Sequence, residues 1–408
     1  MKIKRCRSCK STNIKKVFDL GSQKLSGIFP KTKDQIKLPS GSLSMVFCNS
    51  CNLLQLENSF DPNVMYGDNY GYMSSLNNSM MKHLYNKALG LKKLINLSKG
   101  DLILDIGSND GSFLGFFSKD YIRIGVDPTI KKLGKLYKKD IKKFPNFFTK
   151  ELIEKNFKKK IKLITSISMF YDLENPIKFT EDIYNVLEKD GLWHLEQSYM
   201  PMMLKNNSYD TICHEHLEYY SLKSIKFILD KVGFKIIDLQ FNDINGGSFA
   251  LTVAKKTSKK FKETSSLINW LLQKEELFNY NTISAFKSFY NNISKHKKIF
   301  RDLILNLRND KKNIIGYGAS TKGNIILQFC NLNSKHIPYI AEVNKFKFNR
   351  YTPGSNIKII SEYKAKKINP DYFLVLPWHF KNHIIKKENK YLSRGGKLIF
   401  PLPDIDII

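Results

Sequence analysis

The sequence predicts an α/β protein that begins with a small cysteine-rich module and ends with a second, smaller α/β unit. Three observations predict this fold class. Short apolar stretches alternate with helical segments from about residue 80 onwards, which is typical of a parallel sheet with helices on both faces. Cysteines and turn residues punctuate the first 75 residues, and residues 256–310 show helical periodicity without a strand signal.

These patterns divide the 408 residues into four segments. We expect a β-rich module over 1–75, an α/β domain over 76–255, a helical connector over 256–310 and a smaller α/β domain over 311–408. A helix over 80–97 opens the second segment, whose strands are predicted at 102–106, 122–126, 163–168 and 191–196. Strands of the last segment are predicted at 313–316, 337–341, 372–376 and 397–400.

The composition is that of a soluble globular protein, with 42% hydrophobic and 25% charged residues. The formal net charge of +30 would suit a nucleic-acid binder or a protein that meets anionic ligands. The lysines are spread along the whole chain, as codon bias in an AT-rich genome would produce. We therefore expect no nucleic-acid partner.

The location of the protein is predicted from two absences in the sequence. No apolar run approaches the roughly 18 residues of a membrane span, and the start MKIKRCRSCK lacks the apolar stretch of a signal peptide. We expect a cytoplasmic protein with no membrane partner. Because that compartment is reducing, the six cysteines are better interpreted as metal ligands than as disulfides.

Four of the cysteines predict a structural zinc site. Cys6 and Cys9 form one Cys-x2-Cys pair, and Cys48 and Cys51 form another. Four thiolates can surround one zinc ion tetrahedrally and leave no position open for substrate, so the role of the site is architectural. The ion would supply folding energy to a segment that has little core of its own. Cys213 and Cys330 lie in other segments and are taken as ordinary residues.

The first α/β domain carries the pattern of a nucleoside site. The strand at 102–105 runs into the turn IGSNDG at 106–111, and the next strand ends at Asp127, placed to accept hydrogen bonds from ribose hydroxyls. Asp105 and Asp110 would repel a pyrophosphate but suit the cationic end of S-adenosylmethionine (SAM). A tight turn that holds no ligand is the alternative.

Two further features would complete the cofactor site. Phe147 and Phe148 could flank an adenine, and Ser168 ends the third strand at the crevice where open α/β sheets bind ligands. The candidate cofactor-binding residues are Asp105, Gly107, Asn109, Asp110, Gly111, Asp127, Phe148 and Ser168.

The segment His214-Glu215-His216 is the candidate for acid–base chemistry. The chain has only eight histidines, and two of them lie within three positions here. Histidine is the side chain best suited to take a proton near neutral pH, and Glu215 would orient or polarise it. A second metal site that uses Cys213, or a surface segment without function, would also explain the pattern.

The turn GYGASTKG at 316–323 invites an NAD interpretation for the last domain. It lacks the full dinucleotide fingerprint, and Glu342 is the only supporting acid on the next strand. We interpret it as a degenerate remnant of the fold.

Several motifs together resemble the zinc-containing sugar C-methyltransferases that act on nucleotide-linked keto-deoxysugars. They are the two cysteine pairs, YGDNYGYMSS at 66–75, LDIGSNDG at 104–111, YDTICHEH at 209–216, NGGS at 245–248, GYGASTKG and YTPG at 351–354. The resemblance covers nearly the full chain. It implies a class I methyltransferase Rossmann-like domain with an N-terminal zinc-binding module and a C-terminal smaller Rossmann-like domain that bounds the substrate cleft.

The resemblance also implies roles for individual residues. His216 falls at the position of the catalytic base, with His214 in the same segment, Glu215 and Tyr72 fall at cleft positions, and Asp127 at the ribose contact. SAM and one structural zinc ion are the implied cofactors. Two positions depart from the family pattern, because Cys213 replaces a tyrosine and Asp172 stands where a histidine is usual. These departures put the sugar substrate in doubt but not methyl transfer.

The sequence thus predicts a SAM-dependent methyltransferase that methylates carbon beside a ketone of a nucleotide-linked deoxysugar. The first alternative is an O- or N-methyltransferase of another small metabolite. The second is a zinc-ribbon protein that binds or modifies RNA. A small-molecule substrate is the expected partner, and the protein is expected to be a monomer or homodimer.

Overall fold

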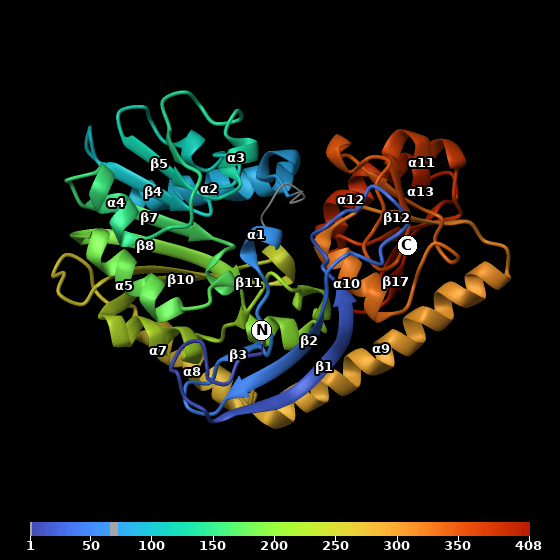
Figure 1. The fold of residues 1–408 in the computed structure, drawn as a ribbon, viewed down its shortest axis with the longest axis horizontal. Coiled ribbons are helices and arrows are strands. Elements are labelled where there is room, and N and C mark those ends of the chain that lie inside the picture. Colours follow the sequence, from blue (N-terminus) through green and yellow to red (C-terminus); the bar gives the residue numbers. More distant parts are fainter. Residues whose placement is uncertain (1, 66–71) are drawn as a thin grey trace.

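The computed structural model describes residues 2–65 and 72–408. Two α/β lobes lie side by side, and the N-terminal strands and one long helix run beneath both of them (Figure 1). Among the described residues, no helix combines the length and the apolar character that a membrane span requires.

The first lobe is built on a seven-stranded sheet of order β6-β5-β4-β7-β8-β11-β10. Six of its strands run in one direction, and β11 alone runs opposite to them, because it pairs antiparallel with both β8 and β10. The bounds are β4 Leu102–Ile106, β5 Ile122–Val126, β6 Lys142–Phe144, β7 Ile161–Ile167, β8 Leu187–Ser198, β10 Phe234–Asn242 and β11 Ser248–Lys255. The four predicted strands, β4, β5, β7 and β8, are parallel as expected, whereas β6, β10 and β11 were not predicted.

Helices cover both faces of this sheet, as predicted. In β4, Leu102, Leu104 and Ile106 belong to one apolar core and Ile103 to the other, because successive side chains of a strand point to opposite faces. One face is covered by α2 Asn78–Leu94, and the opposite core receives side chains of α4, α5 and α7. The bounds of the other helices of this lobe are α3 Ile130–Leu133, α4 Lys150–Asn156, α5 Pro176–Val186, α6 Met200–Lys205 and α7 Leu222–Val232.

Helix α2 begins two residues before the predicted position because of its cap. The Asn77 side chain accepts hydrogen bonds from the backbone N–H groups of Ser79 and Met80, at 2.9 and 3.2 Å. These are donors that the first helical turn leaves without partners. The cap fixes where the chain turns from the 72–76 segment into the helix.

The N-terminal strands share their core with other parts of the chain. The sheet has the order β1-β2-β3-β9, in which β9 comes from the segment directly after His216. Phe18 and Phe47 pack against Phe289 and Phe286 of α9, with ring centroids 5.5 and 5.1 Å apart. The module is thus less dependent on metal for its core than expected. Its bounds are β1 Ile14–Lys24, β2 Ser40–Cys48, β3 Leu54–Leu56, β9 Glu218–Tyr219 and the short helix α1 Pro62–Met65.

Two helices, α8 Ser265–Leu277 and α9 Ile283–Asn309, lead to the second lobe. Its sheet has the order β14-β13-β12-β15-β16-β17, and only β17 is antiparallel to its neighbour. The strands are β12 Ile314–Tyr317, β13 Tyr339–Glu342, β14 Lys358–Ser361, β15 Tyr372–Val375, β16 Lys397–Phe400 and β17 Asp406–Ile407. The helices are α10 Thr321–Phe329, α11 Glu362–Ile368, α12 Lys381–Lys387 and α13 Asn389–Leu392.

The loop between β1 and β2 joins the N-terminal module to the second lobe. Asn324 of α10 donates to the Ser26 carbonyl at 2.7 Å, and the Gln35 amide donates to the Thr352 carbonyl at 3.0 Å. Figure 1 shows this loop lying against the second lobe. These contacts place Ser26 close to the His-Glu-His segment, where the two lobes meet.

Candidate active site and metal centre

The four predicted metal ligands lie together. Their sulfur atoms are all within 4.8 Å of one another, and the Cys6–Cys51 and Cys9–Cys48 pairs are 3.5 Å apart. A tetrahedron with metal–sulfur bonds of about 2.3 Å has edges of about 3.8 Å. The cluster therefore fits a tetrahedral zinc ion.

A glutamine beside the cysteines supports the same conclusion. The Gln55 amide donates to the Cys6 sulfur at 3.2 Å, and its carbonyl oxygen accepts from the Arg7 backbone N–H at 3.0 Å. Such outer hydrogen bonds orient the ligands of metal sites. Gln55 would thus orient the Cys6 ligand in the zinc-bound site.

Arg7 connects the metal centre to the first lobe. Its side chain is buried and forms an ion pair of 3.2 Å with Glu174, and it donates to the Leu56 carbonyl at 2.5 Å. Glu174 borders the large cavity described next. Loss of the metal should therefore change the position of Glu174 at that cavity.

A cavity of about 340 Å³ opens at the carboxyl ends of β4, β5 and β7. This size lies within the range of small-molecule and cofactor sites. Seven of the eight candidate cofactor residues border it, namely Asp105, Gly107, Asn109, Asp110, Asp127, Phe148 and Ser168. Gly111 does not border the cavity and packs against Tyr137 instead.

The walls of the cavity are acidic in a strongly basic protein. The described residues that border it include five carboxylates and no lysine, arginine or histidine: Asp105, Asp110, Asp127, Asp172 and Glu174. Burial raises the pKa of Asp105 to about 7, so a cation bound beside it would favour its ionised form. This donor set suits SAM, which carries an ammonium and a sulfonium group, and disfavours a pyrophosphate.

The backbone of the glycine turn approaches the cavity closely. Gly107 has a φ of 73°, and a Cβ there would lie 2.9 Å from Met169 Cγ. Only glycine adopts this conformation without strain and leaves the space open. The turn after β4 is thereby shaped for a ligand at its surface.

Asp127 holds the same turn from the neighbouring strand. Its carboxylate accepts from the backbone N–H of Asn109 at 2.8 Å and from the backbone N–H of Thr129 at 2.7 Å. Although burial raises its pKa, these hydrogen bonds act in the opposite direction. Asp127 therefore shapes the turn and also borders the cavity at the position expected for a ribose contact.

The side chains of Asn109 and Asp110 form hydrogen bonds with the segment before α2. The Asn109 amide donates to the Tyr72 carbonyl at 3.3 Å, and the Asp110 carboxylate accepts from the Ser75 backbone N–H at 2.8 Å. Tyr72 borders the cavity and is 44% exposed. Residues 66–71 of the YGDNYGYMSS motif lie outside the described residues.

Several cavity residues were not singled out from the sequence. Met80 and Leu84 come from α2, and Asn146 and Phe179 come from later segments. Phe148 packs edge-on against Phe179, at a centroid distance of 5.3 Å. An apolar spacing in a helix looks the same whether it borders a core or a ligand, so the sequence held no signal for Met80 and Leu84.

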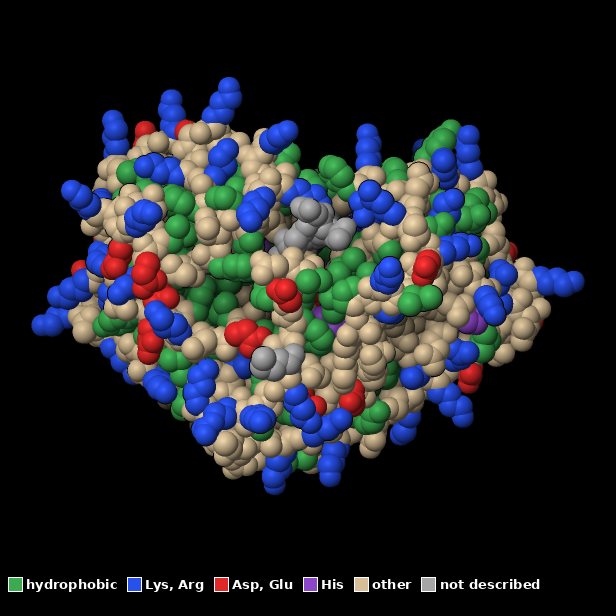
Figure 2. Space-filling model, in the orientation of Figure 1, with side chains coloured by type: hydrophobic (Ala, Val, Ile, Leu, Met, Phe, Trp, Pro, Cys, Tyr) green, Lys and Arg blue, Asp and Glu red, His purple; other side chains and the backbone are tan. Residues whose placement is uncertain are grey.

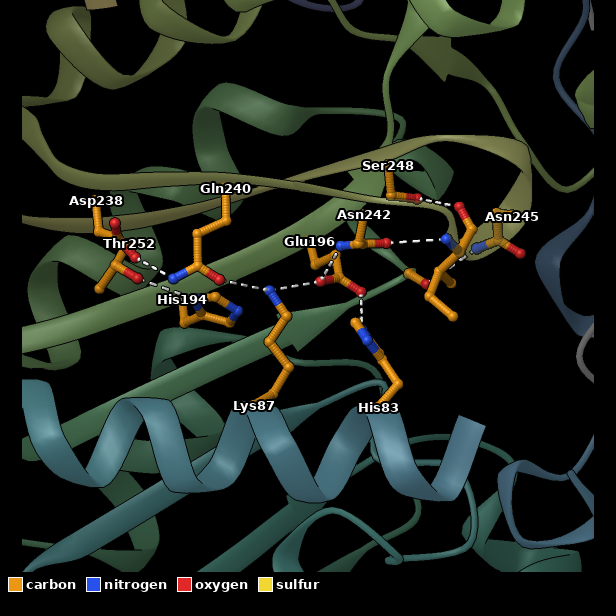
Figure 3. Close-up of polar contacts among 12 residues, drawn as sticks. His83, Lys87, His194, Glu196, Asp238, Gln240, Asn242, Asn245, Ser248 and Thr252 are labelled. Carbon is orange, nitrogen blue, oxygen red and sulfur yellow. Dashed lines mark hydrogen bonds and ion pairs between the residues drawn. The ribbon is translucent and has the colours of Figure 1, made fainter. Parts of the chain in front are cut away.

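A buried carboxylate fixes α2 over the sheet (Figure 3). Glu196 Oε1 lies 2.6 Å from His83 Nε2, and Oε2 lies 2.8 Å from Lys87 Nζ and accepts from the Asn242 amide at 2.9 Å. Although burial opposes ionisation, the hydrogen bond from His83 and the Lys87 charge hold the pKa of Glu196 at about 2. Since α2 carries Met80 and Leu84, this cluster positions one wall of the cavity.

Removal of the Asp127 carboxylate should weaken cofactor binding. In Asp127→Ala, SAM affinity is expected to fall about 5- to 150-fold. This change corresponds to a cost of roughly 1 to 3 kcal/mol, because the ribose hydroxyls are left without an acceptor. Isothermal titration calorimetry measures this change.

Glu342 provides the matched control for Asp127. It follows the same pattern in the second lobe, where it accepts from the Ala319 backbone N–H at 3.0 Å and from the Asn344 backbone N–H at 2.8 Å, but it does not border the cavity. Glu342→Ala should keep the wild-type affinity. Wild-type SAM affinity in Asp127→Ala would remove the ribose role from Asp127.

The hydrogen bonds of Glu342 also bear on the NAD interpretation of the second lobe. Its carboxylate, which stands where a ribose contact would be needed, is occupied by backbone N–H groups of its own domain. Asp127 makes the same kind of contacts in the first lobe, so the fold remnant stays a prediction.

His216 does not border the cavity, but it packs against the short helix η3 Phe170–Asp172, whose last residue does. Its imidazole centroid is 4.2 Å from that of Tyr171, and the neighbouring Asp172 borders the cavity. Nδ1 of His216 is 2.8 Å from the Thr211 carbonyl oxygen, so Nδ1 carries the proton and Nε2 has the free lone pair. Burial, and after it the charge of Lys322, lowers the pKa of His216 to about 3.

His214 and Glu215 contact the N-terminal module. His214 is fully buried, stacks edge-on against Phe60 at 4.8 Å, and places Nε2 3.2 Å from the Gly41 carbonyl oxygen. Glu215 is buried beside the β1–β2 loop, where it accepts from the Ser26 hydroxyl at 3.4 Å, and burial raises its pKa. Within this segment, His216 is the histidine that remains half-buried.

Positive charge is dispersed over the surface. On the face drawn in Figure 2, Lys and Arg side chains cover both lobes, and hydrophobic side chains gather in the hollow between them. A nucleic-acid-binding protein collects its basic residues in a patch or stripe. The dispersed pattern on this face favours the interpretation that the charge is compositional.

Three family models match consecutive parts of the chain. A putative zinc binding domain matches residues 6–66, a methyltransferase domain 79–239 and a C-methyltransferase C-terminal domain 243–403. C-methyltransferase NovU of Streptomyces niveus is 29% identical over 413 residues, which cover 100% of this chain and 97% of that protein.

Solved structures show a more distant likeness. A putative methyltransferase of Bacillus halodurans C-125 has 13% identity and a TM-score of 0.34, over 42% of this chain and 100% of its own. A complex of the Haloferax volcanii Trm112 methyltransferase activator with a putative methyltransferase gives 12% identity and a TM-score of 0.35, over 44% and 94%. Because both TM-scores are below 0.5, nothing about activity follows from them.

The order of the three matching domains is the order of the zinc cluster, the acidic cavity and the second lobe in the structure. The similarity to C-methyltransferase NovU extends over the whole chain. The chain is a SAM-dependent methyltransferase with a structural zinc site, and its sequence is similar to that of a C-methyltransferase in all three domains.

Proposed function

We propose that the enzyme methylates the carbon beside a ketone of a nucleotide-linked deoxysugar, with His216 as the general base. The observation that carries this proposal is the hydrogen bond from His216 Nδ1 to the Thr211 carbonyl. It fixes the tautomer that leaves Nε2 as a proton acceptor. The ring is half-buried and contacts Tyr171, whose neighbour Asp172 borders the cavity.

The chemical step follows from this placement. SAM, when bound, supplies an electrophilic methyl group on a sulfonium centre. His216 Nε2 takes the proton from the carbon beside the ketone, and the electron pair of that C–H bond becomes the enolate. The enolate carbon then forms a bond to the methyl group, and the pair of the broken S–C bond stays on sulfur. General base catalysis of this kind contributes about 10²- to 10⁴-fold.

We place the acceptor between the two lobes, beside the cofactor cavity. Glu215, the Ser26 loop and α10 meet there, because Ser26 contacts both Glu215 and Asn324. The C-terminal domain would bound this cleft, with Tyr72 at its edge. Glu215 would orient the acceptor or polarise its oxygen, and burial, which raises its pKa, favours the protonated form that can donate a hydrogen bond.

We assign His214, which the sequence also made a catalytic candidate, a structural role, because it is buried against Phe60 and the Gly41 carbonyl. The cytoplasmic location stays a prediction. The state of association, monomer or homodimer, stays a prediction as well.

A screen with labelled cofactor tests the acceptor class. The enzyme is incubated with [methyl-¹³C]SAM and a panel of 4-keto-6-deoxysugar nucleotides, beside the matched sugars in which the ketone is a hydroxyl. Mass spectrometry is expected to show one added labelled methyl only on ketones, and NMR should place it on carbon. Methylation of the hydroxyl sugars at an equal rate would favour the O-methyltransferase alternative.

A further inference from the structure

A lysine of the second lobe reaches the His-Glu-His region of the first. Lys322 is the second residue of α10, and α10 packs against the short helix η4 Tyr209–Thr211. Its ammonium group donates to the Asn245 carbonyl at 2.8 Å and to the Thr211 hydroxyl at 3.4 Å. Both contacts cross from one lobe to the other.

Thr211 is shared between this lysine and the proposed base. Its carbonyl accepts from His216 Nδ1 at 2.8 Å while its hydroxyl contacts Lys322 Nζ. The ammonium and the imidazole are therefore both held by the same residue. No comparable link ties His214 to a cation, since its ring partners are Phe60 and the Gly41 carbonyl.

The charge of Lys322 is not cancelled by its hydrogen-bond partners, which are neutral oxygens. Asp210 lies nearby, but its carboxylate accepts from the Trp378 indole N–H at 2.8 Å. Burial lowers the pKa of Lys322, and the charge of Asp210 acts in the opposite direction. A half-buried cation beside an imidazole disfavours a second positive charge on that ring.

The other titratable groups around His216 do not replace this cation. Tyr171 presents a ring, and Asp172 follows it on η3. Glu215 and Cys213 belong to the segment of His216, and burial raises the pKa of each, which favours their neutral forms. His379 of the second lobe also lies near Lys322, and burial and that lysine lower its pKa to about 3.

We propose that Lys322 is a positioning residue of the methyl-transfer site, through which the second lobe supplies a fixed cation that keeps the imidazole of His216 unprotonated. The proposal rests on the proposed role of His216 as base. It gives the C-terminal domain an electrostatic function in addition to bounding the cleft.

The test measures the protonation of His216 directly. The full-length zinc-loaded enzyme, labelled with ¹⁵N-histidine and bound to S-adenosylhomocysteine, is titrated by NMR, and His216→Gln assigns the signal. In Lys322→Met, the imidazolium fraction of His216 at pH 5 is expected to rise about tenfold, which corresponds to a pKa change of one unit. Lys322→Arg should restore the wild-type fraction because it keeps the cation.

Lys347 offers the matched control. It is also a lysine of the second lobe with a pKa lowered by burial, but it donates to the Ala319 carbonyl at 2.8 Å and lies over the Phe29 ring. Lys347→Met should leave the His216 signal unchanged. An unchanged imidazolium fraction in Lys322→Met would overturn the proposal. Because this readout needs no acceptor, it can fail or succeed independently of the C-methylation proposal.

Discussion

His216→Gln is expected to lower turnover about 10²-fold or more while the affinity for SAM stays near the wild-type value. The loss corresponds to roughly 3 kcal/mol of transition-state stabilisation. Glutamine can still donate to the Thr211 carbonyl, but it has no basic nitrogen to accept the acceptor's proton. Steady-state kinetics with an acceptor from the screen and calorimetry with SAM measure the two quantities.

His214→Gln is the matched control, since it makes the same change two residues away. That variant should keep turnover within a few-fold of wild type, and its cost should appear as a lower melting temperature, because His214 is buried against Phe60. Wild-type turnover in His216→Gln would show that the base is another group. A selective loss of turnover in a stable His214→Gln would move the base to His214.

Cys48→Ser is expected to remove most of the zinc and to destabilise the protein by several kcal/mol, lowering its melting temperature by about 10 °C or more. The wild type should purify with about one zinc ion per chain. Loss of the ion leaves Cys6 and Cys51, which are buried, without the metal that holds them together. Metal analysis and thermal unfolding measure both effects.

The structure adds a second readout to this variant. Because Arg7 lies between two ligands and pairs with Glu174 at the cavity, zinc loss should also weaken SAM binding. Cys330→Ser is the control, since Cys330 is buried but outside the cluster, 3.3 Å from the Tyr209 hydroxyl. Full zinc content in Cys48→Ser, or none in freshly purified wild type, would contradict the assignment.

The sequence predicted the elements whose signals are local. Strands β4 and β5 occupy 102–106 and 122–126 as predicted, because each is a short apolar run ended by polar or turn residues. The β10–β11 hairpin was not predicted. Its return through Ile244–Gly246 depends on positive φ angles at Asn245, Gly246 and Gly247. The alternating apolar residues Phe249, Leu251 and Val253 after this turn are a strand signal that was not used.

For the candidate site, the sequence predicted residues that lie together in short motifs. It did not predict residues that only folding brings together. The cysteine pairs and the glycine turn are recognisable from the spacing of their residues. The four cysteines lie together, and residues of the turn border the cavity. Lys322 gave no such signal, because its partners Thr211 and Asn245 are 111 and 77 positions away. The predicted roles of Asn109 and Asp110 were also incomplete. Besides bordering the cavity, their side chains form hydrogen bonds that tie the 72–75 segment to the turn.

The central claim, that His216 removes a proton from carbon, is tested most directly by hydrogen exchange. The enzyme is incubated in D2O with the acceptor and S-adenosylhomocysteine, which cannot donate a methyl group, and the signal of the hydrogen beside the ketone is followed by ¹H NMR. Wild type should replace this hydrogen with deuterium faster than the enzyme-free sample, and His216→Gln should not exceed that background. Product formation by a wild type that never exchanges this hydrogen, or exchange that survives in His216→Gln, would contradict the account.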